Sequence, residues 1–182
     1  MFNVIYADPP WVYNNRKAGG ERRCRTKFGG GAGKHYNLMS IPDICALPVA
    51  SMSAPNSALF MWATMPHLPN AFRVMDAWGF RYVTTAFVWV KTTSKGWAYG
   101  PGYYTASNAE IVLLGVRGKM PPKRKLVQSV IAEPRSEHSR KPDVVYERIE
   151  AMYDGPYLEL FARRSRQGWS SLGDQLDSNI QK

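Results

Sequence analysis

Short apolar runs alternate along the chain with segments in which apolar residues recur at helical spacing. Runs of β-branched and aromatic residues bounded by turn-forming residues are typical of buried strands. We expect strands at residues 2–7, 58–62, 80–91, 109–116, 127–132, 157–162 and 172–176. Helical spacing predicts a short helix capped by Ser40, a helix over residues 66–78 that Gly79 ends, and a helix from Pro142 that Gly155 ends.

The first strand ends in Asp8-Pro9-Pro10-Trp11. Neither proline can donate to a sheet, so Asp8 is expected at the carboxyl end of a strand, where open α/β sheets bind ligands. The Asp8 carboxylate and the Pro9 carbonyl could each accept a hydrogen bond from one N–H group of an adenine amine and so free its lone pair. Trp11, or Tyr13 two residues later, could stack on a base taken out of its helix. An ordinary strand end with a Pro-Pro turn would explain the same residues.

Two basic segments suggest contact with phosphates. Residues 14–35 are rich in glycine and carry seven cations against one acid, and we expect a mobile loop that closes over a base. The nucleic-acid contacts predicted for this part of the chain are Tyr13, Arg22, Arg23, Arg25 and Lys27. Residues 117–125 form a second basic cluster, expected to be a hairpin. For both segments, a solvated surface loop is the alternative.

Residues 95–104 interleave aromatic side chains with glycine and proline, which is not a strand pattern. These aromatic residues could stack on bases or could cap the hydrophobic core, and the sequence favours neither interpretation.

Polar groups also gather near the end of the chain. Pro142 suits the first position of a helix, which would place Ser139, Arg140 and Lys141 at a helix amino terminus that attracts anions. Asp174 and Gln175 could hold ribose hydroxyls or could belong to an ordinary turn.

Composition narrows the function classes. The 182 residues are 45% hydrophobic, enough for one domain over residues 1–182 with its own core. The net charge of +10 favours a polyanionic partner, although many basic proteins never bind nucleic acid. Cys24 and Cys45 are expected to be free thiols in a reducing compartment, and no apolar run is long enough to span a bilayer. We therefore expect a cytoplasmic protein. The histidines show no metal-ligand spacing, so no metal site is predicted.

Four motifs, in this order, resemble those of the MT-A family of adenine-N6 methyltransferases, which is named after the subunit that methylates messenger RNA. They are Asp8-Pro9-Pro10-Trp11, Ser139-Arg140-Lys141-Pro142-Asp143, Glu159-Leu160-Phe161-Ala162-Arg163 and Gly173-Asp174-Gln175-Leu176. The resemblance extends from about residue 4 to residue 176. The bacterial and phage members of the family resemble DNA modification enzymes.

The resemblance implies an α/β fold with the Rossmann-like sheet of S-adenosylmethionine-dependent methyltransferases and a rearranged motif order. The catalytic strand would come first, and the cofactor strand, residues 157–162, near the end. Asp8-Pro9-Pro10-Trp11 would be the catalytic motif, and Lys141 with Ser139 would bind the methionine carboxylate of S-adenosylmethionine. The implied cofactor-binding residues are Asp8, Ser139, Lys141, Glu159, Phe161, Arg163, Asp174 and Gln175.

The sequence departs from the family pattern in two places. Members often carry Asn where this chain has Asp174, and many have a strand before the catalytic one that helps to hold the cofactor's adenine. Only seven residues precede Asp8 here. We therefore expect an adenine pocket with a wall on one side only. A second copy of the chain, a partner subunit or the bound nucleic acid could complete it.

The sequence thus predicts an enzyme that transfers a methyl group from S-adenosylmethionine to the N6 amine of adenine in DNA. An RNA adenine-N6 methyltransferase is the first alternative, because phosphate contacts look alike on both polymers. A catalytically silent nucleic-acid-binding partner subunit is the second. Such a subunit would be expected to lose Asp8 or Lys141, and this chain has both.

Overall fold

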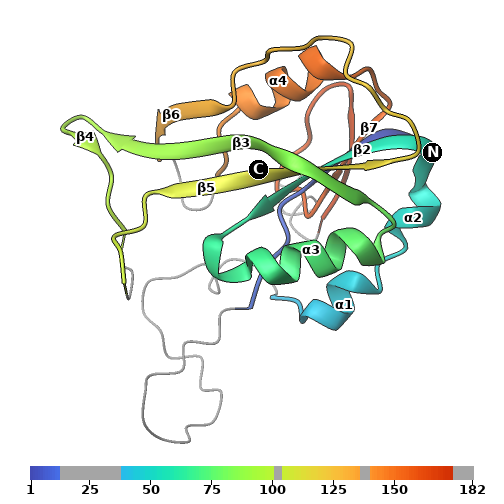
Figure 1. Cartoon of the computed structure of the whole chain (residues 1–182), viewed down its shortest axis with the longest axis horizontal. Helices are drawn as coiled ribbons and strands as arrows, with labels where there is room; N and C mark the ends of the chain where they lie inside the picture. The colour runs from blue at the N-terminus through green and yellow to red at the C-terminus, as the bar shows by residue number, and fades with distance from the viewer. Residues whose placement is uncertain (13–37, 101–103, 136–139, 174–182) are drawn as a thin grey trace, which may run out of the picture.

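The computed structural model describes residues 1–12, 38–100, 104–135 and 140–173, and a mixed sheet of eight strands lies at their centre (Figure 1). The strands are β1 (Phe2–Ala7), β2 (Ser53–Ala63), β3 (Arg81–Thr93), β4 (Gly96–Trp97), β5 (Ala109–Arg117), β6 (Val130–Pro134), β7 (Tyr157–Leu160) and β8 (Trp169–Leu172). Their order across the sheet is β4-β3-β5-β2-β1-β7-β8, with β6 paired to β3. In this part of the chain, no helix has the length and apolar character needed to cross a membrane.

The first strand of the chain is central in the sheet. β1 runs parallel to β2 on one side and to β7 on the other, and β8 continues parallel beyond β7. β5 is antiparallel to both of its neighbours, β2 and β3. The chain thus places strands on opposite sides of β1, and the carboxyl ends of β1, β2 and β7 meet at one edge. Open α/β sheets bind their ligands at such a point.

Helices cover both faces of the sheet (Figure 1). They are α1 (Ile41–Cys45), α2 (Val49–Met52) and α3 (Leu68–Ala77), with a 3-10 turn η2 (Met65–His67) before α3, and α4 (Val144–Met152). Alternate residues of each strand point to opposite faces, which divides the core into two clusters. The α/β fold expected from the sequence is confirmed.

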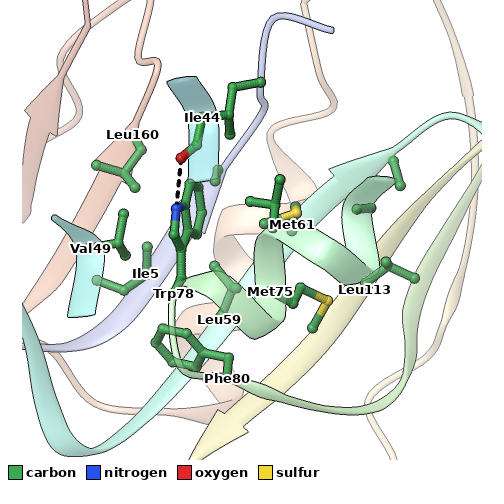
Figure 2. Packing of buried hydrophobic residues seen from close by; sticks show 14 of the residues in the cluster. Ile5, Ile44, Val49, Leu59, Met61, Met75, Trp78, Phe80, Leu113 and Leu160 are labelled. Atoms are coloured by element: carbon green, nitrogen blue, oxygen red, sulfur yellow. Dashed lines mark hydrogen bonds between the residues drawn. The ribbon is translucent and has the colours of Figure 1, made fainter. Parts of the chain in front are cut away.

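The cluster beneath α1, α2 and α3 is built around Trp78, which is fully buried (Figure 2). Its indole Nε1 donates a hydrogen bond of 2.9 Å to the backbone carbonyl of Ile44, so α3 is tied directly to α1. Met75, Phe80 and Leu113 lie in the same cluster. Truncation of a buried tryptophan of this kind costs about 3–5 kcal/mol.

The cluster beneath α4 includes residues near the carboxyl end of β1. Val145 and Ile149 of α4 pack on it, and both are completely buried. Tyr6 of β1 lies in this cluster, where its hydroxyl accepts a hydrogen bond of 2.6 Å from the Trp62 indole of β2. Asp8 comes two residues after Tyr6, so this aromatic layer is the support next to the end of β1.

Local signals predicted several boundaries well. β1 has the expected limits, and Ser40 caps α1 by accepting a hydrogen bond from the Asp43 amide. Gly79 follows α3 with a φ of +79°, a conformation that glycine adopts without strain. The expected helix over residues 66–78 is divided into η2 and the shorter α3.

Other boundaries were wrong. α4 begins at Val144 rather than at Pro142 and ends at Met152, before Gly155. The last strand is Trp169–Leu172, earlier than the expected 172–176, and β6 is displaced to Val130–Pro134. Residues 117–125 do not form a hairpin, because β3 lies between β5 and β6 and pairs with both.

Candidate active site

The Asp8-Pro9-Pro10-Trp11 segment is a closed turn at the end of β1. The Trp11 amide donates to the Pro9 carbonyl at 2.9 Å, and the Met39 amide donates to the Pro10 carbonyl at 3.2 Å. The turn is therefore tied to the segment that leads into α1. A carbonyl oxygen has two lone pairs, so the Pro9 carbonyl keeps the capacity to accept a second hydrogen bond.

Trp11 has a different place from the one expected. Its side chain is only 5% exposed, and its ring stacks on His67 with centroids 5.5 Å apart and planes 12° apart. The structure does not support the interpretation that Trp11 stacks on a base, since its ring packs against His67 and anchors the turn in the core. Burial also lowers the pKa of His67 below its ordinary value. Tyr13 lies outside the described residues.

Lys141 joins two acids at the edge where β1 ends. Its ammonium nitrogen lies 2.9 Å from Asp8 Oδ2 and 3.2 Å from Glu110 Oε2. It also lies over the Trp62 ring, 5.1 Å from the centroid. All three charged side chains are largely buried, so these ion pairs are shielded from solvent screening.

Glu110 is the site residue that the sequence did not predict. It stands at the start of β5, and its other carboxylate oxygen pairs with Lys91 of β3. The side chains therefore form a continuous series of alternating charge, from Asp8 through Lys141 and Glu110 to Lys91. One signal could have found Glu110: it is a charged residue within an otherwise apolar strand sequence.

The electrostatics keep Lys141 and Glu110 ionised. Burial alone would lower the pKa of Lys141, but Asp8 and Glu110 hold it above its ordinary value. Burial would raise the pKa of Glu110, but Lys141 and Lys91 hold it below its ordinary value. Ion pairs enclosed in this way fix the positions of the carboxylates more firmly than surface pairs do.

A second acid, Glu159 of β7, is buried in the α4 face of the sheet. Its Oε1 accepts a hydrogen bond of 2.9 Å from the Tyr146 hydroxyl. Its Oε2 is buried and has no hydrogen-bond partner among the described residues. Burial raises the pKa of Glu159 to about 7; the Tyr146 hydrogen bond lowers it in part and the nearby Asp8 charge raises it further.

This raised pKa predicts a pH-dependent stability. The folded state holds the Glu159 proton up to about pH 7, whereas the unfolded chain releases it near 4.5, so the free energy of unfolding should fall as pH rises through that interval. The loss is up to about 3 kcal/mol. Glu159→Gln cannot ionise and should be more stable than the wild type above the interval, as measured by urea unfolding at one pH below it and one above.

Glu147→Gln is the matched control, because Glu147 is exposed on α4. It should keep the wild-type dependence of stability on pH. An identical pH slope in Glu159→Gln and the wild type would contradict the assignment of this titration to Glu159.

The turn after β7 has a constrained backbone. Phe161 has a φ of +61°, a left-handed conformation that is rare for a non-glycine residue. The Ala162 amide donates to the Leu172 carbonyl at 3.0 Å, which draws the end of β8 against this turn. A Cβ on Gly173 would lie 2.1 Å from the Ala162 carbonyl oxygen, so only glycine fits there. Strain of this kind often accompanies a binding site.

The remaining predicted cofactor residues are only partly described. Ser139, Asp174 and Gln175 lie outside the described residues, as do Arg22, Arg23, Arg25 and Lys27 of the basic loop. Arg163 follows Phe161 in the turn and is partly exposed. The helix-terminus interpretation of Lys141 is wrong, because α4 begins at Val144 and the ammonium instead contacts two carboxylates.

Two arginines, Arg140 and Arg164, hold the segment that carries Lys141 in place through ion pairs with Asp143. Asp143 accepts from Arg140 at 2.9 Å and also pairs with Arg164 of the loop after β7. The segment that carries Lys141 is thus linked to the strand end that carries Glu159 and Phe161. The site therefore combines an acid at the end of β1, a shared buried cation and a half-paired acid on β7.

Comparison with known proteins agrees with this arrangement. A model of the MT-A70 family matches residues 2–175. The Type II methyltransferase M.MunI of Mycoplasma sp is 35% identical over 98% of this chain and 79% of its own length. The N(6)-adenine-specific methyltransferase METTL4 of Homo sapiens is 30% identical over 96% of this chain, and the N(6)-adenosine-methyltransferase MT-A70-like of Arabidopsis thaliana is 29% identical over 97%. The chain spans only 37% and 24% of those two proteins. Since the family model covers nearly all of its residues, the chain belongs to the MT-A70 family of adenine-N6 methyltransferases.

Proposed function

We propose that this protein transfers a methyl group from S-adenosylmethionine to the N6 amine of adenine in DNA. The observation that carries the proposal is the Asp8 carboxylate at the carboxyl end of the central strand, held by the buried Lys141 at 2.9 Å. An acceptor fixed in that position suits an exocyclic amine better than it suits a carbonyl, which has no proton to donate.

The choice of DNA rests on the relatives. M.MunI, which shares 35% identity and most of its length with this chain, is a Type II methyltransferase, and bacterial members of the family resemble DNA modification enzymes. RNA is the second candidate, because the N6-methyladenosine RNA methyltransferase MTA1 of Cryphonectria parasitica is 27% identical over 97% of this chain. That relative is covered over only 52% of its length.

The residues of the chain would act on the adenine amine by position and charge. The amine lone pair is delocalised into the ring, which makes it a poor nucleophile. Asp8 and the Pro9 carbonyl would each accept a hydrogen bond from one N–H group of the amine. These two hydrogen bonds would draw the nitrogen towards tetrahedral geometry and release the lone pair. The amine becomes acidic once it is methylated, so Asp8 orients and polarises it and need not remove a proton first.

Methyltransferases of this family generally use S-adenosylmethionine, which supplies, when bound, a methyl group on a positively charged sulfur. The residues present fit such a group. The buried Glu159 Oε2, which has no hydrogen-bond partner among the described residues, could share a hydrogen bond with a ribose hydroxyl. An ammonium has three donors, of which Lys141 directs two to carboxylates. The third donor of Lys141 could reach the methionine carboxylate. Phe161 and Arg163 follow β7 on the same edge and would line the cofactor.

The basic segment of residues 14–35 would contact the nucleic-acid backbone without reading its sequence. Replacement of Arg22, Arg23 and Arg25 by alanine should weaken DNA binding and reduce its salt dependence. On duplex DNA, the slope of log affinity against log salt should fall by about 0.9 for each phosphate that is no longer neutralised. Anisotropy titrations over a series of salt concentrations measure both quantities. Unchanged affinity and slope would mean that these arginines do not contact DNA.

A comparison of substrates tests whether the protein methylates DNA or RNA. Equal amounts of duplex DNA, single-stranded DNA and RNA of the same sequence are incubated with the protein and labelled cofactor, and kcat/KM is measured for each. We expect a DNA substrate to have the highest kcat/KM and the product to be N6-methyladenine. A higher kcat/KM on RNA would assign the protein to the RNA enzymes. No transfer to any polymer would favour a silent partner subunit, and the protein's mass in solution would then show whether it forms a homodimer.

A further inference from the structure

A cavity of about 200 Å³ lies beside the far end of the charged series, next to Lys91. The β3–β4 hairpin and the residues before β5 form its walls. The lining residues are Lys91, Ala98, Tyr99, Gly100, Ser107 and Arg135. This volume is well above the ~10–15 Å³ that a single water molecule needs, so the cavity can admit a larger polar group.

Backbone hydrogen bonds hold the walls of this cavity in place. The Ala98 amide donates to the Lys91 carbonyl at 2.8 Å, and the Gly100 amide donates to the Ser107 carbonyl at 2.7 Å. A Cβ on Gly100 would lie 2.8 Å from the Ser107 carbonyl oxygen, so this close approach requires glycine. The cavity is therefore part of the sheet's end rather than a space between loose side chains.

The residues that line the cavity include two cations, Lys91 and Arg135, and no acid. Lys91 contributes its stem and an ammonium that pairs with Glu110, which also pairs with Lys141 at 3.2 Å. Arg135 follows β6 and is exposed, and no ion pair to its side chain is found in the described part of the chain. Asp8 belongs to the same series of contacts, so the cavity neighbours the proposed methylation site.

One aromatic residue, Tyr99, lines the cavity, and a second, Trp97, lies two residues before it in the chain. Tyr99 is 67% exposed and Trp97 of β4 is 55% exposed, while Ala98 between them is buried. The interpretation that these aromatic residues cap the core is therefore wrong for Tyr99 and Trp97. Exposed aromatic rings beside cations are the combination that binds single-stranded nucleic acid, since the rings stack on bases and the cations contact phosphates.

We propose that this cavity binds the nucleotide next to the adenine being methylated, with its phosphate between Lys91 and Arg135 and its base on Tyr99. The inference rests on the proposed function, because a polynucleotide must be the substrate. It adds a second contact point to the site: the flipped adenine would lie at Asp8 while its neighbour is held at the end of β3.

The test uses the full chain and a labelled single-stranded DNA oligonucleotide with one adenine. Arg135→Ala should weaken binding and lower the salt slope by about 0.7, because one phosphate is no longer neutralised. Tyr99→Ala should weaken binding about fivefold or more, whereas Tyr99→Phe should retain most of the affinity. Arg73→Ala is the matched control, since Arg73 is exposed on α3 and does not line the cavity, and it should bind like the wild type.

Unchanged affinity and salt slope in both Arg135→Ala and Tyr99→Ala would overturn the inference. So would a dimeric mass in solution that Tyr99→Ala returns to monomer, because the face would then be a protein interface. Methylation of the same oligonucleotide by the wild type tests the proposed function separately. Normal methylation with unaffected binding in both variants would reject this cavity and leave the proposed function standing.

Discussion

Asp8→Asn is expected to lower the rate of methyl transfer by about a hundredfold to a thousandfold, a barrier increase of about 2.7–4 kcal/mol. Asparagine has nearly the same shape as aspartate, so the turn should persist. The change removes the negative charge that polarises the amine. In the wild type, the Lys141 ammonium lies 2.9 Å from the Asp8 carboxylate. If the new amide turns its oxygen towards the adenine amine, its NH2 group faces this ammonium instead.

The rate is measured at saturating cofactor with a DNA substrate, and circular dichroism and the melting temperature confirm that the variant is folded. Asp76→Asn is the matched control, because Asp76 is exposed on α3 at the other face of the sheet, and it should keep wild-type activity. An Asp8→Asn rate within about tenfold of the wild type, or ~1.4 kcal/mol, would remove Asp8 from the catalytic role.

Lys141→Met is expected to lower the free energy of unfolding by about 3–5 kcal/mol and to abolish methyl transfer. The methionine fills much of the space of the lysine stem but leaves the carboxylates of Asp8 and Glu110 without their shared cation. Both carboxylates are largely buried, so water cannot replace the missing positive charge. Urea unfolding measures the effect, with Lys125→Met as an exposed control that should change stability little.

A double variant separates the two roles of Lys141. Lys141→Met with Glu110→Gln removes one of the two carboxylate charges that Lys141 balances and should recover part of the stability. The coupling energy follows from the cycle of single and double variants. Full additivity of the two single changes would contradict the shared ion pair. Calorimetric titration with S-adenosylmethionine then tests the second role. A methionine-carboxylate contact predicts weaker cofactor binding in the double variant than in Glu110→Gln alone.

Local sequence signals predicted the part of the site that depends on neighbouring residues. β1 could be placed because an apolar run ends in two prolines. The position of Asp8 at the carboxyl end of this strand follows from the same signal. The cap of α1 by Ser40 and the end of α3 at Gly79 have the same local origin. The family resemblance gave the methyltransferase fold with its rearranged motif order, which the family match confirms.

The residues that sequence reasoning missed or misplaced depend on contacts between distant parts of the chain. Glu110 reaches the site because β5 enters the sheet antiparallel to β2 and starts at the edge where β1 and β2 end. Trp11 is buried because His67, far along the chain, supplies a ring to stack on. Residues 117–125 would suit a hairpin by composition, but β3 takes the position that such a hairpin needs. Pairing of this kind cannot be read from local periodicity.

The most direct test of the central claim is nucleoside analysis of DNA after incubation with S-adenosylmethionine and either the wild type or Asp8→Asn. The same samples are assayed for cofactor binding. The account predicts N6-methyladenine with the wild type and almost none with Asp8→Asn, although the variant is folded. It would be contradicted if the methyl group appeared on another base or another atom of adenine, or if Asp8→Asn produced N6-methyladenine at the wild-type rate.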